Sequence, residues 1–181
     1  MNNLSSVKLY VSEGFTSDDN IKNVARSIFR VLGNGKEKYN ELETKLNYQH
    51  NGLLSKQLNT LLDMELIDKI YPINKKDNSK KISYVLSSNP LRFYYTYVYG
   101  KDNLISLIGE DNYFDAYINK SIKDFISRRF EEQAKEFISK LVKNGKIKDV
   151  KNIGTYYYDD PISKTNGEFD IAIETNKGYS I

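Results

Sequence analysis

The chain of 181 residues contains no cysteine and no tryptophan, and it has a single histidine. Without cysteine, the protein can form no disulfide and use no thiol chemistry, and a zinc site would depend on the lone His50. Because His50 lies in a polar turn with no partner at ligand spacing, we expect a surface histidine. No apolar run approaches the roughly 20 residues that cross a bilayer, and the N-terminus has no signal-peptide pattern. We therefore expect a soluble, cytoplasmic protein without a membrane partner.

A phosphate-binding loop is also missing. The dipeptides Gly35-Lys36 and Gly145-Lys146 are followed by Glu37 and Ile147, where the motif needs Ser or Thr to hold Mg²⁺. We interpret both glycines as helix ends, and we expect no ATPase site and no cofactor in this chain. The net charge of +3 is too small to indicate a nucleic-acid partner by itself, so the positions of the lysines carry more information.

The N-terminal half predicts three helices and two strands. Ser17 caps a first helix, whose apolar stripe is Ile21, Val24, Ile28 and Leu32, and Tyr39, Leu42 and Leu46 indicate a second. A third helix starts at Gly52, because Leu54, Leu58, Leu61 and Leu62 repeat at helical spacing. Strands are expected at 67–73 and 82–86, with the basic loop 74–81 between them. Residues 17–86 therefore predict a winged helix-turn-helix domain after an N-terminal extension, 1–16.

This domain offers two sets of side chains to DNA. The third helix presents Lys56, Gln57, Asn59 and Thr60 to base edges or phosphates, and the loop presents Lys75, Lys76, Lys80 and Lys81 to phosphates, against one Asp77. Because the helix carries one basic residue, we expect backbone binding more than sequence-specific readout. A protein-binding winged helix with solvated lysines is the alternative.

The stretch Ser87–Pro90 predicts a domain boundary, because Pro90 disfavours helix at Asn89. In the second domain, 87–181, we expect helices at 91–99 and 104–108 and a long helical region from Phe114 to Leu141. The apolar residues of the long region are predicted to lie on one side: Ile118, Ile122, Phe125, Ile126, Phe130, Ala134, Phe137, Ile138 and Leu141. Strands follow at 153–158, 168–173 and 179–181, and the last looks cut short.

Two carboxylates form the candidate catalytic and metal site. Glu131 lies on the long helix, and Asp170 lies at the centre of the strand 168–173, where alternation places it on the face opposite Ile171 and Ile173. A carboxylate in an apolar strand needs a partner, a metal or water, and two carboxylates can hold Mg²⁺ through oxygen ligands. An ordinary exposed carboxylate is the alternative.

Several short motifs in order resemble a family of archaeal and bacterial AAA-type ATPases. They are Arg92-Phe-Tyr-Tyr, Phe130-Glu131, Ile153-Gly154-Thr-Tyr-Tyr157 and Glu168-Phe-Asp-Ile171, preceded by a winged-helix segment from Leu54 to Ile73. The resemblance implies an ATPase domain, a winged helix and then a restriction-endonuclease-like domain. It matches the helix Glu to Glu131 and the strand Asp to Asp170. It also implies a Glu-x-Lys on the next strand, which the sequence does not contain.

We therefore expect an α+β chain: a winged helix-turn-helix followed by a truncated restriction-endonuclease-like α/β domain. It would be a C-terminal fragment that binds DNA and partners the missing ATPase domain of its own chain. The fragment itself is expected to be inactive, with Mg²⁺ used only by the full-length protein. The rival is a non-enzymatic regulatory module that binds DNA or protein, and the oligomeric state stays open.

Overall fold

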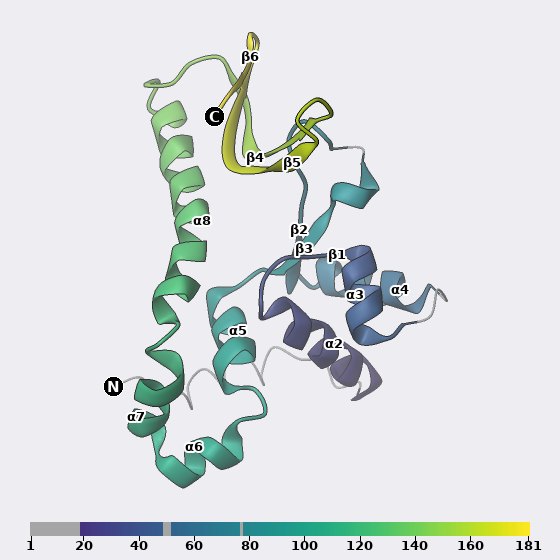
Figure 1. Ribbon diagram of the computed structural model, residues 1–181, viewed down its shortest axis with the longest axis vertical. Helices are drawn as coiled ribbons and strands as arrows, with labels where there is room; N and C mark the ends of the chain where they lie inside the picture. Colours follow the sequence, from purple (N-terminus) through teal and green to yellow (C-terminus); the bar gives the residue numbers. More distant parts are fainter. Residues whose placement is uncertain (1–18, 49–51, 77) are drawn as a thin grey trace. The chain divides into compact units, whose positions relative to one another are not determined.

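The computed structural model describes residues 19–48, 52–76 and 78–181, which fall into two compact units (Figure 1). Unit 1 holds the described residues up to Ile70 together with Ile82–Asn119, and unit 2 holds Tyr71–Lys81 together with Lys120–Ile181. The predicted extension 1–16, the Ser17 cap and His50 lie outside the described residues. The protein is a mixture of helices and antiparallel sheets, as the predicted α+β class requires.

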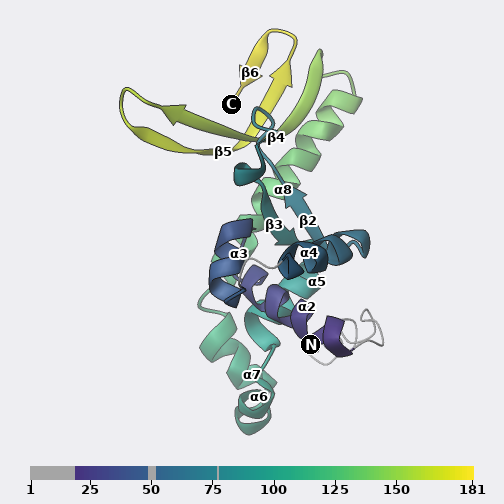
Figure 2. The ribbon, with the colours of Figure 1, turned by 90° about the vertical axis from the view of Figure 1, so that its right-hand side faces the viewer.

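Unit 1 begins with the three predicted helices. They are α2 (Asp19–Leu32), α3 (Tyr39–Leu46) and α4 (Leu53–Asp63), and Figure 2 shows them beside the strands of the unit. Their apolar faces meet in one core, because leucine and aromatic side chains recur at helical spacing and bury best together. The core residues are Ala25, Ile28, Phe29, Leu32, Leu42, Leu54, Leu58, Leu61, Ile67, Tyr84, Leu86, Leu91 and Tyr95.

A small antiparallel sheet completes this core. Strands β1 (Glu37–Lys38), β2 (Ile67–Ile70) and β3 (Ser83–Leu86) pair in the order β1-β3-β2. The two-residue β1 was not predicted, because it is too short to show any periodicity. The prediction that the strand from Ile67 runs to Ile73 is wrong: β2 ends at Ile70, and the following residues pair elsewhere.

Unit 1 continues past the predicted boundary at Ser87–Pro90. Helix α5 (Asn89–Phe93) starts there, with the Ser88 hydroxyl accepting a hydrogen bond from the Leu91 amide at 3.3 Å. The expectation that Asn89 is not helical is wrong, because Pro90 occupies the first turn, where its missing amide hydrogen costs nothing. The π-helical η2 (Tyr94–Val98) follows, then α6 (Asp102–Ile108), α7 (Glu110–Tyr113) and the π-helical η3 (Phe114–Ile118).

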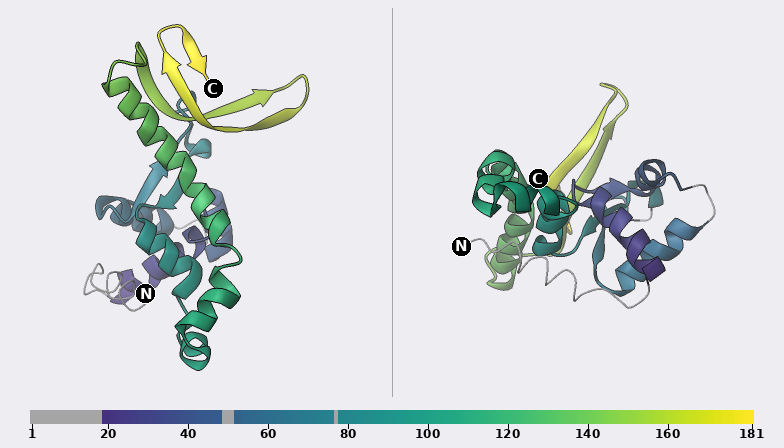
Figure 3. Two further views of the ribbon diagram at one scale, coloured as in Figure 1. Left: turned by 90° about the vertical axis from the view of Figure 1, so that its left-hand side faces the viewer. Right: turned by 90° about the horizontal axis from the view of Figure 1, so that it is seen from below.

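Unit 2 contains the segment Tyr71–Lys81 with the short 3-10 helix η1 (Ser79–Lys81), one long helix, α8 (Ile122–Lys143), and a second antiparallel sheet. Strands β4 (Val150–Asp160), β5 (Thr165–Thr175) and β6 (Gly178–Ser180) pair in the order β4-β5-β6, and α8 packs against β4 and β5. The predicted strands are confirmed, although β4 and β5 are longer than expected. Figure 3 shows β4 and β5 as a long two-stranded ribbon, with α8 as one continuous helix.

The predicted helical region from Phe114 to Leu141 is interrupted by a turn at residues 119–121, so Ile118 belongs to unit 1, where it is fully buried. The expectation of one apolar side along the whole region is therefore wrong for Ile118, which belongs to a separate helix. On α8 itself, Ile126, Phe130 and Phe137 lie in the middle of the predicted apolar side, yet they are 59%, 70% and 60% exposed. Within the described ranges, no helix combines the length and the hydrophobicity needed to cross a membrane.

Candidate functional site

Helix α4 has the two faces that its sequence predicts. Leu54, Leu58 and Leu61 are each 1% exposed and fill the core of unit 1. On the other side Lys56 and Asn59 are exposed and Gln57 and Thr60 are half-buried. The Thr60 hydroxyl donates a hydrogen bond to the Lys56 carbonyl at 3.1 Å, so its proton is already engaged within the helix. The α4 side chains whose hydrogen-bond donors remain available to a ligand are therefore Lys56, Gln57 and Asn59.

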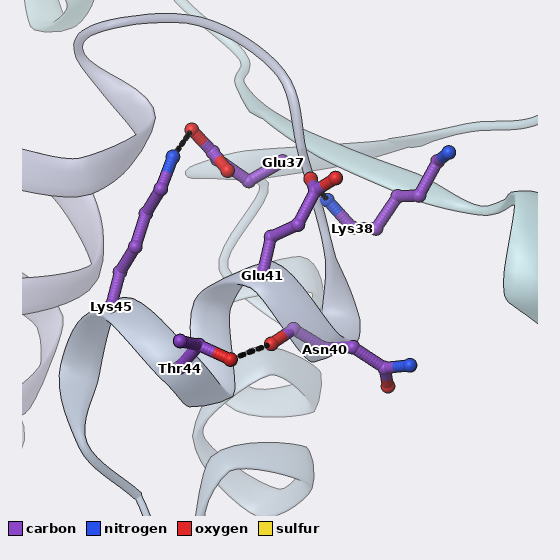
Figure 4. A network of polar contacts seen from close by, with 6 residues as sticks. All are labelled: Glu37, Lys38, Asn40, Glu41, Thr44 and Lys45. Atoms are coloured by element: carbon purple, nitrogen blue, oxygen red, sulfur yellow. Dashed lines mark hydrogen bonds and ion pairs between the residues drawn. The ribbon is translucent and has the colours of Figure 1, made fainter.

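The polar contacts around α3 hold this helix in place (Figure 4). The largely buried Glu37 carboxylate pairs with the Lys45 ammonium group, and the Lys38 amide donates to the Glu41 carboxylate at 2.7 Å. A hollow of about 560 Å³ lies beside this pair, lined by Ser27, Arg30, Val31, Asn34, Lys45, Leu46 and Tyr48. Since Glu37 already neutralises Lys45, we assign this hollow no ligand.

The loop between β2 and β3 is attached to the second sheet. The Ile73 amide donates to the Thr155 carbonyl at 2.8 Å. The Asn74 side chain makes two bonds to Tyr157: its amide nitrogen donates to the carbonyl at 2.8 Å, and its oxygen accepts from the backbone amide at 3.1 Å. Because β4 pairs with β5 on its other side, these bonds satisfy backbone groups of Thr155 and Tyr157 on the outer edge of β4. The sequence indicated a free wing and gave no signal of this contact.

The loop lysines fall into two groups. The Lys81 ammonium group lies 3.6 Å from the centroid of the Tyr157 ring, a cation–π contact that leaves it half-buried. Lys75, Lys76 and Lys80 are exposed. The four predicted phosphate contacts are therefore not equivalent, since three lysines are exposed and Lys81 already interacts with an aromatic ring.

Charge is unevenly divided between the units. Unit 2 contains 16 Lys and Arg against 11 Asp and Glu, a net charge of +5. Unit 1 contains 11 Lys and Arg against 13 Asp and Glu, a net charge of −2. The loop therefore contributes its lysines to the basic unit, while α4 belongs to the slightly acidic one. An attraction to polyanions follows for unit 2.

Gly154 lies where the loop approaches β4 most closely. A Cβ atom at this position would lie 2.7 Å from the Cγ2 atom of Ile73, which is nearer than real Cβ contacts come. Ile73 itself is 6% exposed, so its side chain has little room to move away. Glycine at position 154 thus allows the Ile73 side chain to pack directly onto the β4 backbone.

The candidate carboxylates both lie in unit 2. Asp170 is exposed on β5, and Glu131 is half-exposed on α8 and takes part in an interaction there. The structure describes no group of three or more His, Asp and Glu side chains that could hold a metal ion. A magnesium site shared by Glu131 and Asp170 therefore remains a prediction.

The environment of Asp170 differs from the predicted alternation. Ala172 pairs with Gly154 and Phe169 pairs with Tyr156, so two residues of β5, Asp170 and Ile171, stand opposite Thr155 alone. This β-bulge breaks the strict alternation, and the expectation that Asp170 and Ile171 point to opposite faces is wrong. Bulges commonly redirect side chains next to functional sites, so the bulge makes this part of β5 a candidate site.

An aromatic cluster on the second sheet was not predicted from the sequence. The rings of Tyr156 and Tyr179 lie 4.9 Å apart, and those of Tyr158 and Phe169 lie 5.1 Å apart. Phe169 is 39% and Tyr179 43% exposed. Desolvation, and then the nearby Glu174 carboxylate, raises the pKa of Tyr179. The strand pairing that brings these rings together is not visible in the order of residues along the chain.

Comparison with known proteins finds matches to parts of the chain. Residues 94–181 match the model of a family (DUF234) described as "Archaea bacterial proteins of unknown function". An uncharacterized protein of Methanocaldococcus jannaschii is 28% identical over 123 residues, which is 67% of this chain. The match covers 27% of the length of that relative. No solved structure matches the chain.

Proposed function

We propose that the protein is a DNA-binding module, in which unit 1 is a winged helix and α4 faces the duplex. The observation that carries this proposal is the two-sided character of α4, with a leucine face in the core and donors on the solvent side. The element order helix, strand, helix, helix, strand, strand and the sheet order β1-β3-β2 support the winged-helix assignment. In such a fold the helix corresponding to α4 enters the major groove.

The chemistry of α4 suits contacts with bases and backbone alike. Gln57 and Asn59 carry amides that can pair with adenine, and Lys56 can reach guanine or a phosphate. With a single lysine on the helix, direct readout would involve few base pairs. Most of the binding free energy would then come from phosphates, with little dependence on sequence.

The loop Tyr71–Lys81 is the second proposed contact. Lys75, Lys76 and Lys80 are exposed and have no ion-pair partner among the described residues. Each lysine that neutralises a phosphate contributes about −0.9 to the slope of log affinity against log salt. Three such contacts predict a contribution of about −2.7, and Lys81 would add to it only by leaving Tyr157.

Fluorescence anisotropy with labelled duplex DNA over a range of salt tests the proposal. Replacing Lys75, Lys76 and Lys80 by Ala should flatten the slope by about 2.7. The matched control replaces Lys140, Lys143 and Lys146, which are equally exposed and lie in the same unit. Equal flattening in both triple variants would mean general attraction to unit 2, and absence of binding at low salt would refute the proposal.

For the full-length protein we propose an ATPase-family architecture with a nuclease-like domain, as the motif resemblance implies. Helix α8 packed on an antiparallel sheet, with Glu131 and Asp170 both in unit 2, is compatible with it. The test is Mg²⁺-dependent DNA cleavage by the full-length protein, compared between wild type and Asp170→Ala, which leaves no side-chain oxygen to bind the metal. Cleavage that persists unchanged in the variant would exclude Asp170 as a metal ligand.

The rival function is a regulatory module that binds a protein. The exposed apolar stripe of Ile126, Phe130 and Phe137 on α8 favours it, since exposed apolar patches commonly mark protein contacts. Replacing Phe130 and Phe137 by Ser separates the two functions. DNA affinity should remain unchanged if the stripe serves a protein partner, whereas a parallel loss of DNA affinity would assign it to the DNA surface.

A further inference from the structure

We infer that Asn74 and Tyr157 are positioning residues for DNA binding: they hold the basic loop Tyr71–Lys81 in an ordered conformation before DNA arrives. The inference rests on the proposed DNA-binding function and deepens it. It makes β4 the support of the binding loop, although Asn74 and Tyr157 lie 83 residues apart in the chain.

The contacts fix the loop at both of its ends. At the start, the Ile73 amide and the Asn74 side chain together make three hydrogen bonds to the edge of β4, at 2.8, 2.8 and 3.1 Å. The Asn74 amide group bonds both backbone groups of Tyr157, as a neighbouring strand would. At the end, Lys81 lies over the Tyr157 ring. Tyr157 of β4 therefore contacts both ends of the loop.

Between these ends the loop has its own hydrogen bonds. The Lys75 amide donates to the Pro72 carbonyl at 2.9 Å, and the Asn78 amide donates to the Lys75 carbonyl at 3.0 Å. The Asn78 side-chain oxygen accepts from the Lys80 amide at 3.1 Å. The backbone next to Lys75 and Lys80 thus makes hydrogen bonds within the loop, although both side chains are exposed.

Order in the free protein matters because binding normally costs the entropy of fixing loops and side chains. A basic loop attached only to β2 and β3 would lose this entropy on meeting DNA. The bonds to β4 remove much of that loss in advance, so they should strengthen binding without adding any phosphate contact. The affinity and the salt slope therefore respond differently: loosening the loop lowers affinity, and removing a lysine changes the slope.

The test compares Asn74→Ala with Asn166→Ala, which removes an exposed asparagine of β5 with no side-chain bond in the described structure. Hydrogen exchange of the Tyr157 amide reports whether the loop is released. In Asn74→Ala this amide should exchange faster, DNA affinity should fall about tenfold, and the salt slope should stay within experimental error. Asn166→Ala should match the wild type in all three measurements.

A second variant guards against a folding defect. Tyr157→Leu removes the ring beneath Lys81 and leaves the backbone bonds of Asn74 available, and it too should weaken binding. Because this variant releases Lys81 to reach a phosphate, the salt slope should steepen by no more than about 0.9. Wild-type affinity in Asn74→Ala despite faster exchange at Tyr157 would overturn the inference and leave the proposed function standing. Tighter binding would overturn it as well, because the contact would then compete with DNA. If the wild-type protein binds no DNA, the proposed function and the inference both fall.

Discussion

The close approach of Ile73 to Gly154 supports a quantitative prediction. A Cβ atom on residue 154 would lie 2.7 Å from the Ile73 Cγ2 atom, and carbon atoms normally rest about 3.5 to 4.0 Å apart. Gly154→Ala must therefore displace the Ile73 side chain or the loop by nearly 1 Å. Overpacking of this kind costs about 1 to 3 kcal/mol. The same displacement strains the bond from the Ile73 amide to Thr155.

The effect of Gly154→Ala on stability should change sign when the Ile73 Cγ2 atom is removed. In an Ile73→Ala background the Cγ2 atom is gone, and alanine at position 154 then only restricts the unfolded chain. That restriction stabilises a protein by about 0.4 to 1 kcal/mol. Ile73→Ala alone should cost about 2 to 4 kcal/mol, since the side chain is 6% exposed. The coupling energy between the two substitutions should thus reach about 1.5 to 4 kcal/mol, the sum of the two opposite effects.

The assay is a double-mutant cycle measured by urea denaturation, with hydrogen exchange of the Ile73 amide reporting on unit 2 separately. Ile162→Ala serves as the control, because Ile162 is 93% exposed and its loss should change stability by less than about 0.5 kcal/mol. If Gly154→Ala has the same effect in both backgrounds to within about 0.5 kcal/mol, the two residues are not coupled. The packing of the loop on β4 would then be wrong.

Three further predictions concern unit 1. Leu58→Ala should lower the free energy of unfolding by about 2 to 5 kcal/mol, because the side chain is 1% exposed. The exposed Asn59 should behave differently: Asn59→Ala should change the free energy of unfolding by less than about 0.5 kcal/mol and weaken DNA binding. Urea denaturation measures the first effect and fluorescence anisotropy the second. Burial raises the pKa of Tyr95, so its neutral form stabilises the fold fully below about pH 10, and this contribution is lost as the pH rises further. In Tyr95→Phe, thermal stability should therefore fall less between pH 10 and 12 than in the wild type. An equal fall in both proteins would refute this prediction. Ser88→Ala should cost about 1 kcal/mol, since the Leu91 amide loses its partner, and a neutral result in thermal unfolding would mean that α5 needs no cap.

Local patterns sufficed to predict the elements with many contacts inside one segment. The spacing of Leu54, Leu58 and Leu61 predicted α4 and its buried face, because a helix places such residues on one side whatever surrounds it. The strands β4, β5 and β6 were predicted from short-period runs for a similar reason. Gly145 ends α8 with a φ of 70°, as a helix-end glycine does.

Pairings between distant segments were decided by the tertiary structure alone. The bulge at Asp170 and Ile171 exists only because β5 pairs with β4 in a particular register. Asn74 in the loop likewise forms hydrogen bonds with Tyr157, which lies 83 residues away in the sequence. Whether Phe130 on α8 is buried likewise depends on what packs beside it, which its own spacing does not encode. The sequence determines which faces are apolar and which loops are basic. Their partners follow from hydrogen bonds and contacts between residues that no local pattern connects.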